Sequence, residues 1–246
     1  VEAARGGRWS IFTASLVLAL AFLHNIFFIA TSRTTLVVIP VLILIYGARQ
    51  FGWKGFFGAA AAGLAIAAAL WTTSPYLRDR AIGALSQTEK FAYEDKATST
   101  GQRIVYWTKS LHIIKNAPLI GHGTGSITEM FQRAAIGHSG VWAEVASNPH
   151  NQTLTVAIQL GLIGTTALWA MWVSHFLLFR GAGLVAWFGL VVVAQNVVGS
   201  LFNSFLFDFT EGWLYVLGVG VAGGMVLRQC DAARAGRDSA AEHDSR

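Results

Sequence analysis

The sequence predicts an all-α membrane protein: a polytopic membrane helix bundle of about six transmembrane helices, with one large external loop containing amphipathic helices. Two observations carry this prediction. Hydrophobic residues make up 54% of the chain and charged residues only 13%, whereas about a quarter of the residues in a soluble domain are charged. The hydrophobic residues also gather in runs long enough to cross a bilayer, and one polar stretch separates them into two groups.

Three spans are expected in residues 1–74 and three more in residues 151–228, with the external loop, 75–150, between them. We place the individual spans near residues 10–31, 34–47, 54–74, 151–179, 183–205 and 209–227. The polar tail, 229–246, is expected to be disordered in the cytoplasm. Because the chain does not begin with Met and its first span starts near Ser10, we expect it to be the C-terminal part of a longer protein.

Basic residues near the span ends predict the orientation of the bundle. They lie before span one, between spans two and three, between spans four and five, and after span six, and they are Arg5, Arg8, Arg49, Lys54, Arg180, Arg228, Arg234 and Arg237. Alternate threading puts all four groups on one side, which the positive-inside rule assigns to the cytoplasm. The net charge of +5 is therefore interpreted as topology and contact with anionic lipid, not nucleic-acid binding.

The external loop contains an amphipathic helix over residues 100–116. One face of this helix carries Ile104, Trp107, Leu111 and Ile114, and we expect that face to lie against the membrane or the span bundle. Arg103 lies in the first turn, where a cation opposes the helix dipole. Two explanations stay open: the side chain simply reaches solvent, or Arg103 and the unpaired N–H groups of that turn bind an anion.

A glycine-rich stretch, PLIGHGTGS, follows at residues 118–126 with Gly121, Gly123 and Gly125 in alternation. It is neither a Walker A loop nor a dinucleotide-binding fingerprint, because the residues that complete those motifs are missing. Alternating glycines do indicate a turn whose backbone approaches another group closely.

The histidines and glutamates of the external loop match no common zinc pattern, and the loop has no Cys. The residues concerned are His112, His122, His138, His150, Glu129 and Glu144. We therefore expect no metal and no cofactor.

The stretch SNPHNQTL, residues 147–154, stands where the external loop enters span four. Ser147 or Asn148 can cap the helix and Pro149 suits its first position, which would put His150 in the first turn. A helix N-terminus disfavours imidazolium, so the ring is expected to be neutral and able to act as a general base. A purely structural histidine is the alternative.

Arg33 opens span two on the same outer face, so three basic residues are expected at three outer helix starts. Two arginines at helix N-termini suit a doubly charged anion such as diphosphate, and a neutral base beside it suits a hydroxyl nucleophile. Polar residues in and after span five are expected to line the same cavity: Gln195, Asn196, Asp208 and Glu211.

These motifs resemble the C-terminal half of the O-antigen ligase family, which shares a domain with O-antigen polymerases and some protein O-oligosaccharyltransferases. The matching pieces are SRT at 32–34, GQRIVYWTKSL followed by APLIGHGTGS, NPHNQTLTVAIQLGLIG, and SFLFDFTEGWLYVLGVG at 204–220. Members of the family have further spans before this region, and their absence here is the main departure.

The resemblance implies a multi-pass enzyme of the bacterial inner membrane whose active site faces the periplasm. Its partners would be an undecaprenyl-diphosphate-linked glycan donor, a lipid A–core or other glycan acceptor and the lipid bilayer, with no nucleic acid. Arg33 and Arg103 would hold the diphosphate and His150 would act on the acceptor hydroxyl, in a metal-independent, inverting transfer. Substrate contacts would include Gly121, Gly123, Gly125 and Asn151.

O-antigen ligase is the first choice of function that the resemblance implies. A polymerase or O-oligosaccharyltransferase of the same superfamily is the alternative, because these motifs do not separate them. A polysaccharide or lipid transporter subunit is the alternative from another class. A transporter would place broken helices or paired charges at mid-membrane, whereas the candidate residues here lie at the interface.

Overall fold

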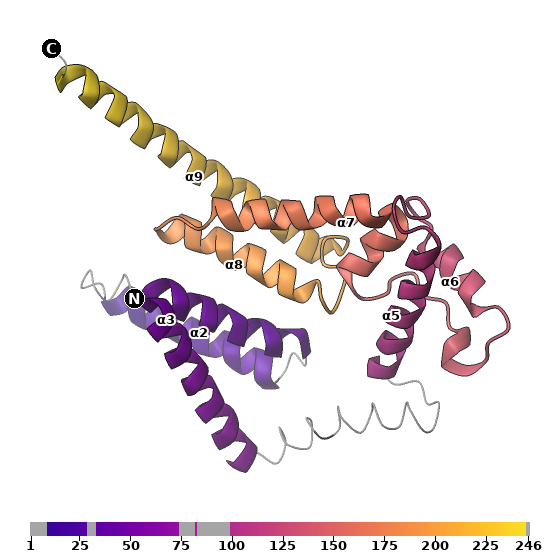
Figure 1. Cartoon of the computed structure of the whole chain (residues 1–246). Coiled ribbons are helices and arrows are strands. Elements are labelled where there is room, and N and C mark those ends of the chain that lie inside the picture. The colour runs from indigo at the N-terminus through magenta and orange to yellow at the C-terminus, as the bar shows by residue number, and fades with distance from the viewer. Residues whose placement is uncertain (1–8, 29–32, 74–81, 83–98, 245–246) are drawn as a thin grey trace.

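A computed structural model describes residues 9–28, 33–73, 82 and 99–244, and the regular secondary structure of these residues is entirely helical (Figure 1). The helices are α2 (Trp9–Phe28), α3 (Arg33–Thr73), α5 (Ser99–Asn116), α6 (Ile127–Ala135), the 3-10 helix η1 (Gly140–Ala143), α7 (Gln152–Leu178), α8 (Leu184–Gly199) and α9 (Phe209–Asp244). The all-α prediction is confirmed.

Helices occupy each of the six regions in which we expect spans. Among the described residues, three helical stretches are long and apolar enough to cross a membrane: Val37–Thr73, Gln152–Leu178 and Phe209–Ser239. Trp9–Phe22 and Leu184–Gly199 are shorter apolar helices. The protein is therefore a helical membrane protein, while the number of spans stays a prediction.

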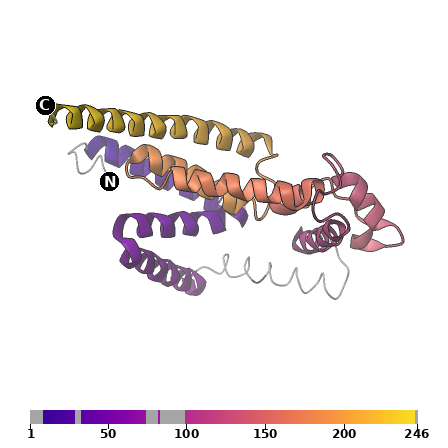
Figure 2. The same ribbon diagram turned by 45° about the horizontal axis from the view of Figure 1, so that its top comes forward.

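The second and third expected spans form one bent helix, α3. Its backbone leaves helical geometry at Gly52, where φ is 61° and ψ is −148°. The two arms approach closely beside this bend, because a Cβ added to Gly47 would lie 2.6 Å from the carbonyl oxygen of Gly55. The bend is visible in Figure 2. It explains why the hydrophobic pattern suggests two helices here.

The core of the bundle lies between α7, α8 and α9. Its largest fully buried side chains include Trp172 and Phe179. The ring of His175 in α7 is hydrogen-bonded through Nδ1 to the hydroxyl of Tyr215 in α9, at 2.7 Å. His175 therefore joins two neighbouring helices of the bundle.

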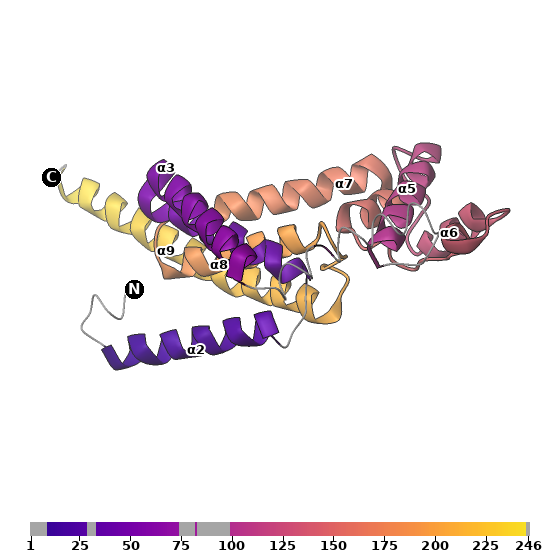
Figure 3. The same cartoon turned by 90° about the horizontal axis from the view of Figure 1, so that it is seen from below.

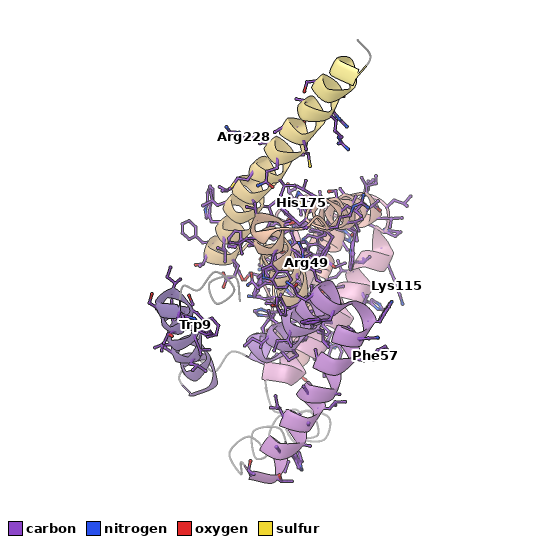
Figure 4. All side chains as sticks on the ribbon, turned by 90° about the vertical axis from the view of Figure 1, so that its left-hand side faces the viewer. Trp9, Arg49, Phe57, Lys115, His175 and Arg228 are labelled. Carbon is purple, nitrogen blue, oxygen red and sulfur yellow. The ribbon has the colours of Figure 1, made fainter. Side chains whose placement is uncertain are left out.

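Arg49 joins the bend of α3 to the turn between α7 and α8. Its guanidinium donates to the carbonyl of Phe179 at 3.1 Å and to that of Gly181, and it lies 5.6 Å from the ring centre of Trp187. Figure 4 shows Arg49 among the bundle helices and Arg228 far along α9. The basic group predicted between spans two and three therefore meets the group predicted between spans four and five. Both lie at one end of the bundle, as alternate threading of the spans requires.

The expected disordered tail, 229–246, is instead a continuation of α9 as far as Asp244. Its sequence, CDAARAGRDSAAEHD in part, is polar but rich in Ala and Arg, which are among the strongest helix formers. Polarity alone was therefore the wrong criterion, since a helix already started in the membrane needs no new nucleus to continue.

The external segment packs at the opposite end of α7 from Arg49. Seen from below, α5 and α6 lie together beside the start of α7 (Figure 3). Helix α5 matches its predicted range of 100–116, but it packs on α6, η1 and α7 through Val105, Lys109, Ser110 and Ile113. Ile104 and Leu111, from the predicted apolar face, are 40% and 55% exposed. These two side chains do not pack on the bundle, and their contact with the membrane stays a prediction.

Candidate functional site

The turn before α7 differs from the predicted helix cap. Asn151 is the N-cap, its Oδ1 accepting the N–H of Leu154 at 3.1 Å, so His150 precedes the helix and does not lie in its first turn. The Asn148 side chain accepts the His150 N–H at 2.8 Å, and this Asx turn reverses the chain. His150 has a φ of 54°, the only positive φ at a non-glycine residue in the described part of the chain.

This backbone conformation is unusual for a side chain with a Cβ, and such strain clusters at functional sites, at a cost of roughly 1–3 kcal/mol. Because His150 lies before α7, the prediction that the first turn of this helix keeps the ring neutral is wrong. The hydrogen bonds of the imidazole now define its chemistry.

The His150 side chain is oriented by the connection between α8 and α9. Its Nδ1 lies 2.9 Å from Asn203 Oδ1, and the Asn203 amide donates to Asp208 Oδ2 at 2.6 Å. An amide oxygen only accepts, so Nδ1 carries the proton of this bond. In the neutral imidazole the lone pair is then on Nε2, which is the atom able to take a proton from a substrate.

Asp208 anchors this chain of three residues. Burial raises the pKa of its carboxyl above the usual value; the negative charge of Glu211 acts in the same direction, and His150 opposes both. The strong bond from the Asn203 amide fixes which end of that amide faces the imidazole.

The connection that carries Asn203 is held firmly to the start of α7. The Gln152 N–H donates to the Ser200 carbonyl at 2.9 Å, and the Gln152 side-chain oxygen accepts the Leu206 N–H at 3.0 Å. The Asn151 side chain donates to the Leu201 carbonyl at 3.1 Å. Gln152 is fully buried. These bonds fix the register of the two segments that place His150 and Asn203.

Helix α5 supplies the other wall of the site. The Tyr106 ring is stacked on the His150 ring with centroids 6.4 Å apart, and the Trp107 indole donates to the Pro149 carbonyl at 3.0 Å. The Tyr106 hydroxyl donates to Glu144 at 2.9 Å. Burial, followed by this carboxylate, raises the pKa of Tyr106 to about 12, so the phenol stays protonated as a donor.

Arg103 lies on the same face of α5 as these two aromatic residues, because residues three and four apart are neighbours on a helix. Arg103 is half-buried and engaged in an interaction of its own. The structure therefore brings the Arg103 turn of α5 to the His150 turn. Arg33 is the first residue of α3, but its side chain lies outside those described, and its approach to the site stays a prediction.

The glycine-rich loop meets α7 at a break in that helix. At Gly161, φ is 59° and ψ is −152°. The Ile158 and Gln159 carbonyls accept from His122 and Gly123, both at 2.9 Å. In exchange, the N–H groups that follow the break reach back to the loop: Leu162 donates to Pro118 at 2.8 Å and Ile163 to Leu119 at 3.2 Å.

This exchange satisfies the backbone groups that the break releases, as a helix in a membrane requires. The close approach predicted from the glycines is confirmed: a Cβ added to Gly121 would lie 2.4 Å from the backbone of Gln159. Gly123 and Gly125 have φ of 93° and 82° with open space at the Cβ position. Packing on α7 is a sufficient reason for Gly121, and substrate contact by the three glycines stays a prediction.

Three of the residues considered for zinc have other contacts. His122 Nε2 is bonded to the Ile113 carbonyl, Glu129 pairs with Arg133, and the Glu144 carboxylate accepts from Gln102 and Tyr106. Within the described ranges, no three His, Cys, Asp or Glu side chains are grouped to hold a metal ion.

Sequence reasoning missed Asn203, Tyr106 and Glu144. The available signal for Asn203 was a polar side chain in the mainly apolar connection FNSFLFD, between two apolar helices, where polar groups are usually paired or functional. Asp208 was expected at the cavity and does belong to the His150 network. Asn196 is buried in α8, one turn before Ser200.

A comparison with protein families finds a match over residues 14–169 to the family described as O-antigen ligase. The match covers more than half of the chain and includes Arg33, Arg103, the three loop glycines, His150 and Asn151. It ends before Asn203 and Asp208. A search of curated proteins gave no match.

Proposed function

The chain belongs to the O-antigen ligase family and is a membrane glycosyltransferase of the ligase or polymerase type; from this premise we propose that it acts as an O-antigen ligase. It transfers a glycan from an undecaprenyl-diphosphate carrier to a hydroxyl of lipid A–core, at the periplasmic face of the inner membrane. The observation that carries this proposal is the oriented imidazole of His150, with the Arg103 turn of α5 beside it.

In the proposed reaction, His150 Nε2 takes the proton of the acceptor hydroxyl as its oxygen attacks the anomeric carbon of the donor. A new glycosidic bond forms, and the bond between that carbon and the diphosphate oxygen breaks. The electron pair leaves with the undecaprenyl diphosphate, and the proton stays on His150 until solvent removes it. A single displacement of this kind inverts the anomeric carbon and needs no metal ion.

Arg33 and Arg103 are proposed to bind the diphosphate and to neutralise the charge that grows on it as the bond breaks. Asn203 and Asp208 are positioning residues, which hold the imidazole with Nε2 toward the substrate. Asn151 and the loop glycines are proposed to border the bound glycan. The stacked Tyr106 ring prevents the imidazole from tilting.

Lipopolysaccharide from a strain that lacks this protein separates ligase from polymerase. A strain without its ligase makes lipid A–core with no O-antigen, and its gel shows core bands only. A strain without its polymerase retains core with a single repeat unit. Full-length O-antigen in the deletion strain would contradict both assignments, and the parent gene supplied in trans is the control.

Replacing Arg33 or Arg103 by Lys should weaken binding of the diphosphate donor about tenfold or more, because Lys lacks the planar fork that binds two phosphate oxygens together. The measurement is the KM for the donor, or its Kd, with the purified membrane protein. Arg228→Lys, on the exposed surface of α9, is the matched control and should change neither. An unchanged donor affinity in both test variants would remove the diphosphate clamp.

Replacing Asn203 by Ala should lower kcat about tenfold while the KM for the donor stays constant, since the ring loses its fixed orientation but the diphosphate site is intact. The pH profile distinguishes this role from general stability. Activity of the parent should fall on the acid side as Asp208 gains a proton, and because burial raises the pKa of Asp208, this fall should come above the pH typical of an exposed carboxyl.

In Asn203→Ala, Asp208 is disconnected from the imidazole, so the part of the acid limb that protonation of Asp208 causes should be lost. Asn116→Ala, at the exposed end of α5, provides the control. Identical acid limbs in parent and variant would show that Asn203 does not link the two groups.

A further inference from the structure

A pocket lies on the external segment. It has a volume of about 470 Å³ and is formed by α5, α6 and the segment that leads into η1. Its lining residues are Thr108, Lys109, His112, Arg133, Ala134, Ile136, His138 and Trp142. This volume lies within the roughly 300–1,000 Å³ of small-ligand sites.

Two aromatic rings separate this pocket from His150. The Tyr106 ring, which stacks on His150, also contacts Phe131 edge-on with centroids 5.8 Å apart. On the pocket side, the Lys109 ammonium lies 6.0 Å from the Phe131 ring centre. The Tyr106–Phe131 pair therefore lies between His150 and the Lys109 side of the pocket.

The charge of the pocket is strongly one-sided. Lys109, His112, Arg133 and His138 line it, and no Asp or Glu is among its lining residues within the described segments. Lys109 is only 4% exposed, and its ammonium donates at 2.9 Å to the backbone carbonyl of Glu144, a neutral acceptor. The Glu144 carboxylate is directed at Gln102 and Tyr106.

A buried ammonium with a neutral partner is costly, and burial accordingly lowers the pKa of Lys109, with the Glu144 charge opposing this shift. A bound anion would relieve that cost. Arg133 already pairs with Glu129 on the exposed surface of α6, and such a surface pair is weak enough to exchange for a ligand.

The remaining wall of the pocket is aromatic. Trp142 in η1 is 37% exposed, and its ring lies 6.3 Å from that of His138. A partly exposed indole offers a flat apolar face with a polar edge. Such a face suits the C–H side of a sugar ring, while the basic residues opposite suit an acidic substituent on the same sugar.

We propose that this pocket is a subsite for an acidic sugar, one that carries a carboxylate or a phosphate, in a glycan whose reacting end lies at His150. The inference rests on the proposed function, since it takes the glycan as the substrate. The acidic sugar belongs either to the donor chain or to the acceptor oligosaccharide.

Direct binding to the full chain in nanodiscs tests the pocket separately from transfer. The probes are trigalacturonic acid and maltotriose, an acidic and a neutral trisaccharide, with binding followed by titration calorimetry. Trigalacturonic acid should bind at least about tenfold more tightly and should weaken as NaCl is added. Equal affinities for the two probes would overturn the proposal.

Substitutions of exposed residues that line the pocket test whether the probes bind there. The double variant Arg133→Gln/His112→Gln, called the rim variant, should lower the affinity for trigalacturonic acid about tenfold. Trp142→Ala should weaken the binding of both probes. These side chains are exposed, so the fold should tolerate their loss better than that of Lys109. Arg228→Gln is the charge-matched control. Unchanged acid binding in the rim variant would overturn the assignment to this pocket.

The His150→Ala variant should bind trigalacturonic acid as well as the parent does, so loss of transfer and loss of this subsite are distinguishable. In a transfer assay, a raised KM for the acceptor in the rim variant assigns the acidic sugar to the acceptor, and a raised KM for the donor assigns it to the donor. If both KM values stay at the parent level, the pocket is not a subsite of the reaction.

Discussion

Replacing His150 by Ala is expected to lower kcat for glycan transfer by at least about 100-fold, because a positioned general base contributes roughly 10²- to 10⁴-fold. The imidazole is held by two contacts: its Nδ1 is bonded to Asn203, and its face is stacked on Tyr106. The backbone N–H of His150 is bonded to Asn148, which fixes the turn that carries the ring. No other group in this arrangement can replace the Nε2 lone pair. The measurement is single-turnover transfer from a saturating donor.

The structural cost of this change should be small, so activity and folding are separable. His150 is half-buried, and alanine retains the backbone N–H that donates to Asn148. The left-handed φ of 54° remains slightly unfavourable for Ala, at roughly 1 kcal/mol. His243→Ala, in the last turn of α9, is the matched control and should transfer glycan normally.

Two results bear on the assignment. Normal membrane insertion and thermal stability with transfer lost would support His150 as the base, whereas full activity of His150→Ala would eliminate it. Retained donor affinity in the variant is also expected, because the diphosphate is assigned to the arginines. A large loss of donor affinity would point to a binding role for the imidazole in place of proton transfer.

Local sequence patterns predicted the helices of this protein well. They did not predict the distant contacts that decide which of several suitable residues caps a helix. The stretch SNPHN holds three residues that can cap a helix, Ser147, Asn148 and Asn151. The choice of Asn151 is made by distant partners: the Trp107 indole binds the Pro149 carbonyl, and the Gln152 N–H binds the Ser200 carbonyl. The residues of the stretch itself give no signal from which these distant contacts could be predicted.

The same limit applies to the site as a whole. His150 and Arg103 were identifiable because each stands out locally, as a basic residue near a helix start. Asn203 stands 53 residues from His150, in a connection whose fold depends on Gln152 and Ser204. Its role follows only from the three-dimensional contact. The α5 face was ambiguous for a related reason, since apolar residues lie on two sides of that helix and only packing decides which side is buried.

The largest stability effect is expected for Gly161→Ala, in the break of α7. A Cβ at this position would lie 2.4 Å from the backbone of Leu119, and the residue has a φ of 59°. Neither atom of this clash belongs to a flexible side chain, so the loop and the helix must separate. The cost combines overpacking, a left-handed alanine and weakened backbone hydrogen bonds, and we expect it to exceed about 3 kcal/mol.

The consequence should reach the catalytic end of the helix. The first turns of α7, from Gln152 to Leu160, carry the contacts that position His150, and the glycine-rich loop holds these turns relative to the rest of the span. Gly161→Ala should therefore lower both the midpoint of thermal denaturation in detergent and the transfer rate. Gly220→Ala, in α9 with no atom within 4 Å of the added Cβ, should be nearly neutral.

Gly121→Ala should reproduce this loss from the other side of the contact, because its Cβ would lie 2.4 Å from the backbone of Gln159. Both changes disrupt the same exchange of hydrogen bonds between loop and helix. The double variant should therefore lose less stability than the two single losses added together, as expected for residues that share one contact. Additive losses would mean that the two glycines act independently, and a stable Gly161→Ala protein would contradict the inserted loop.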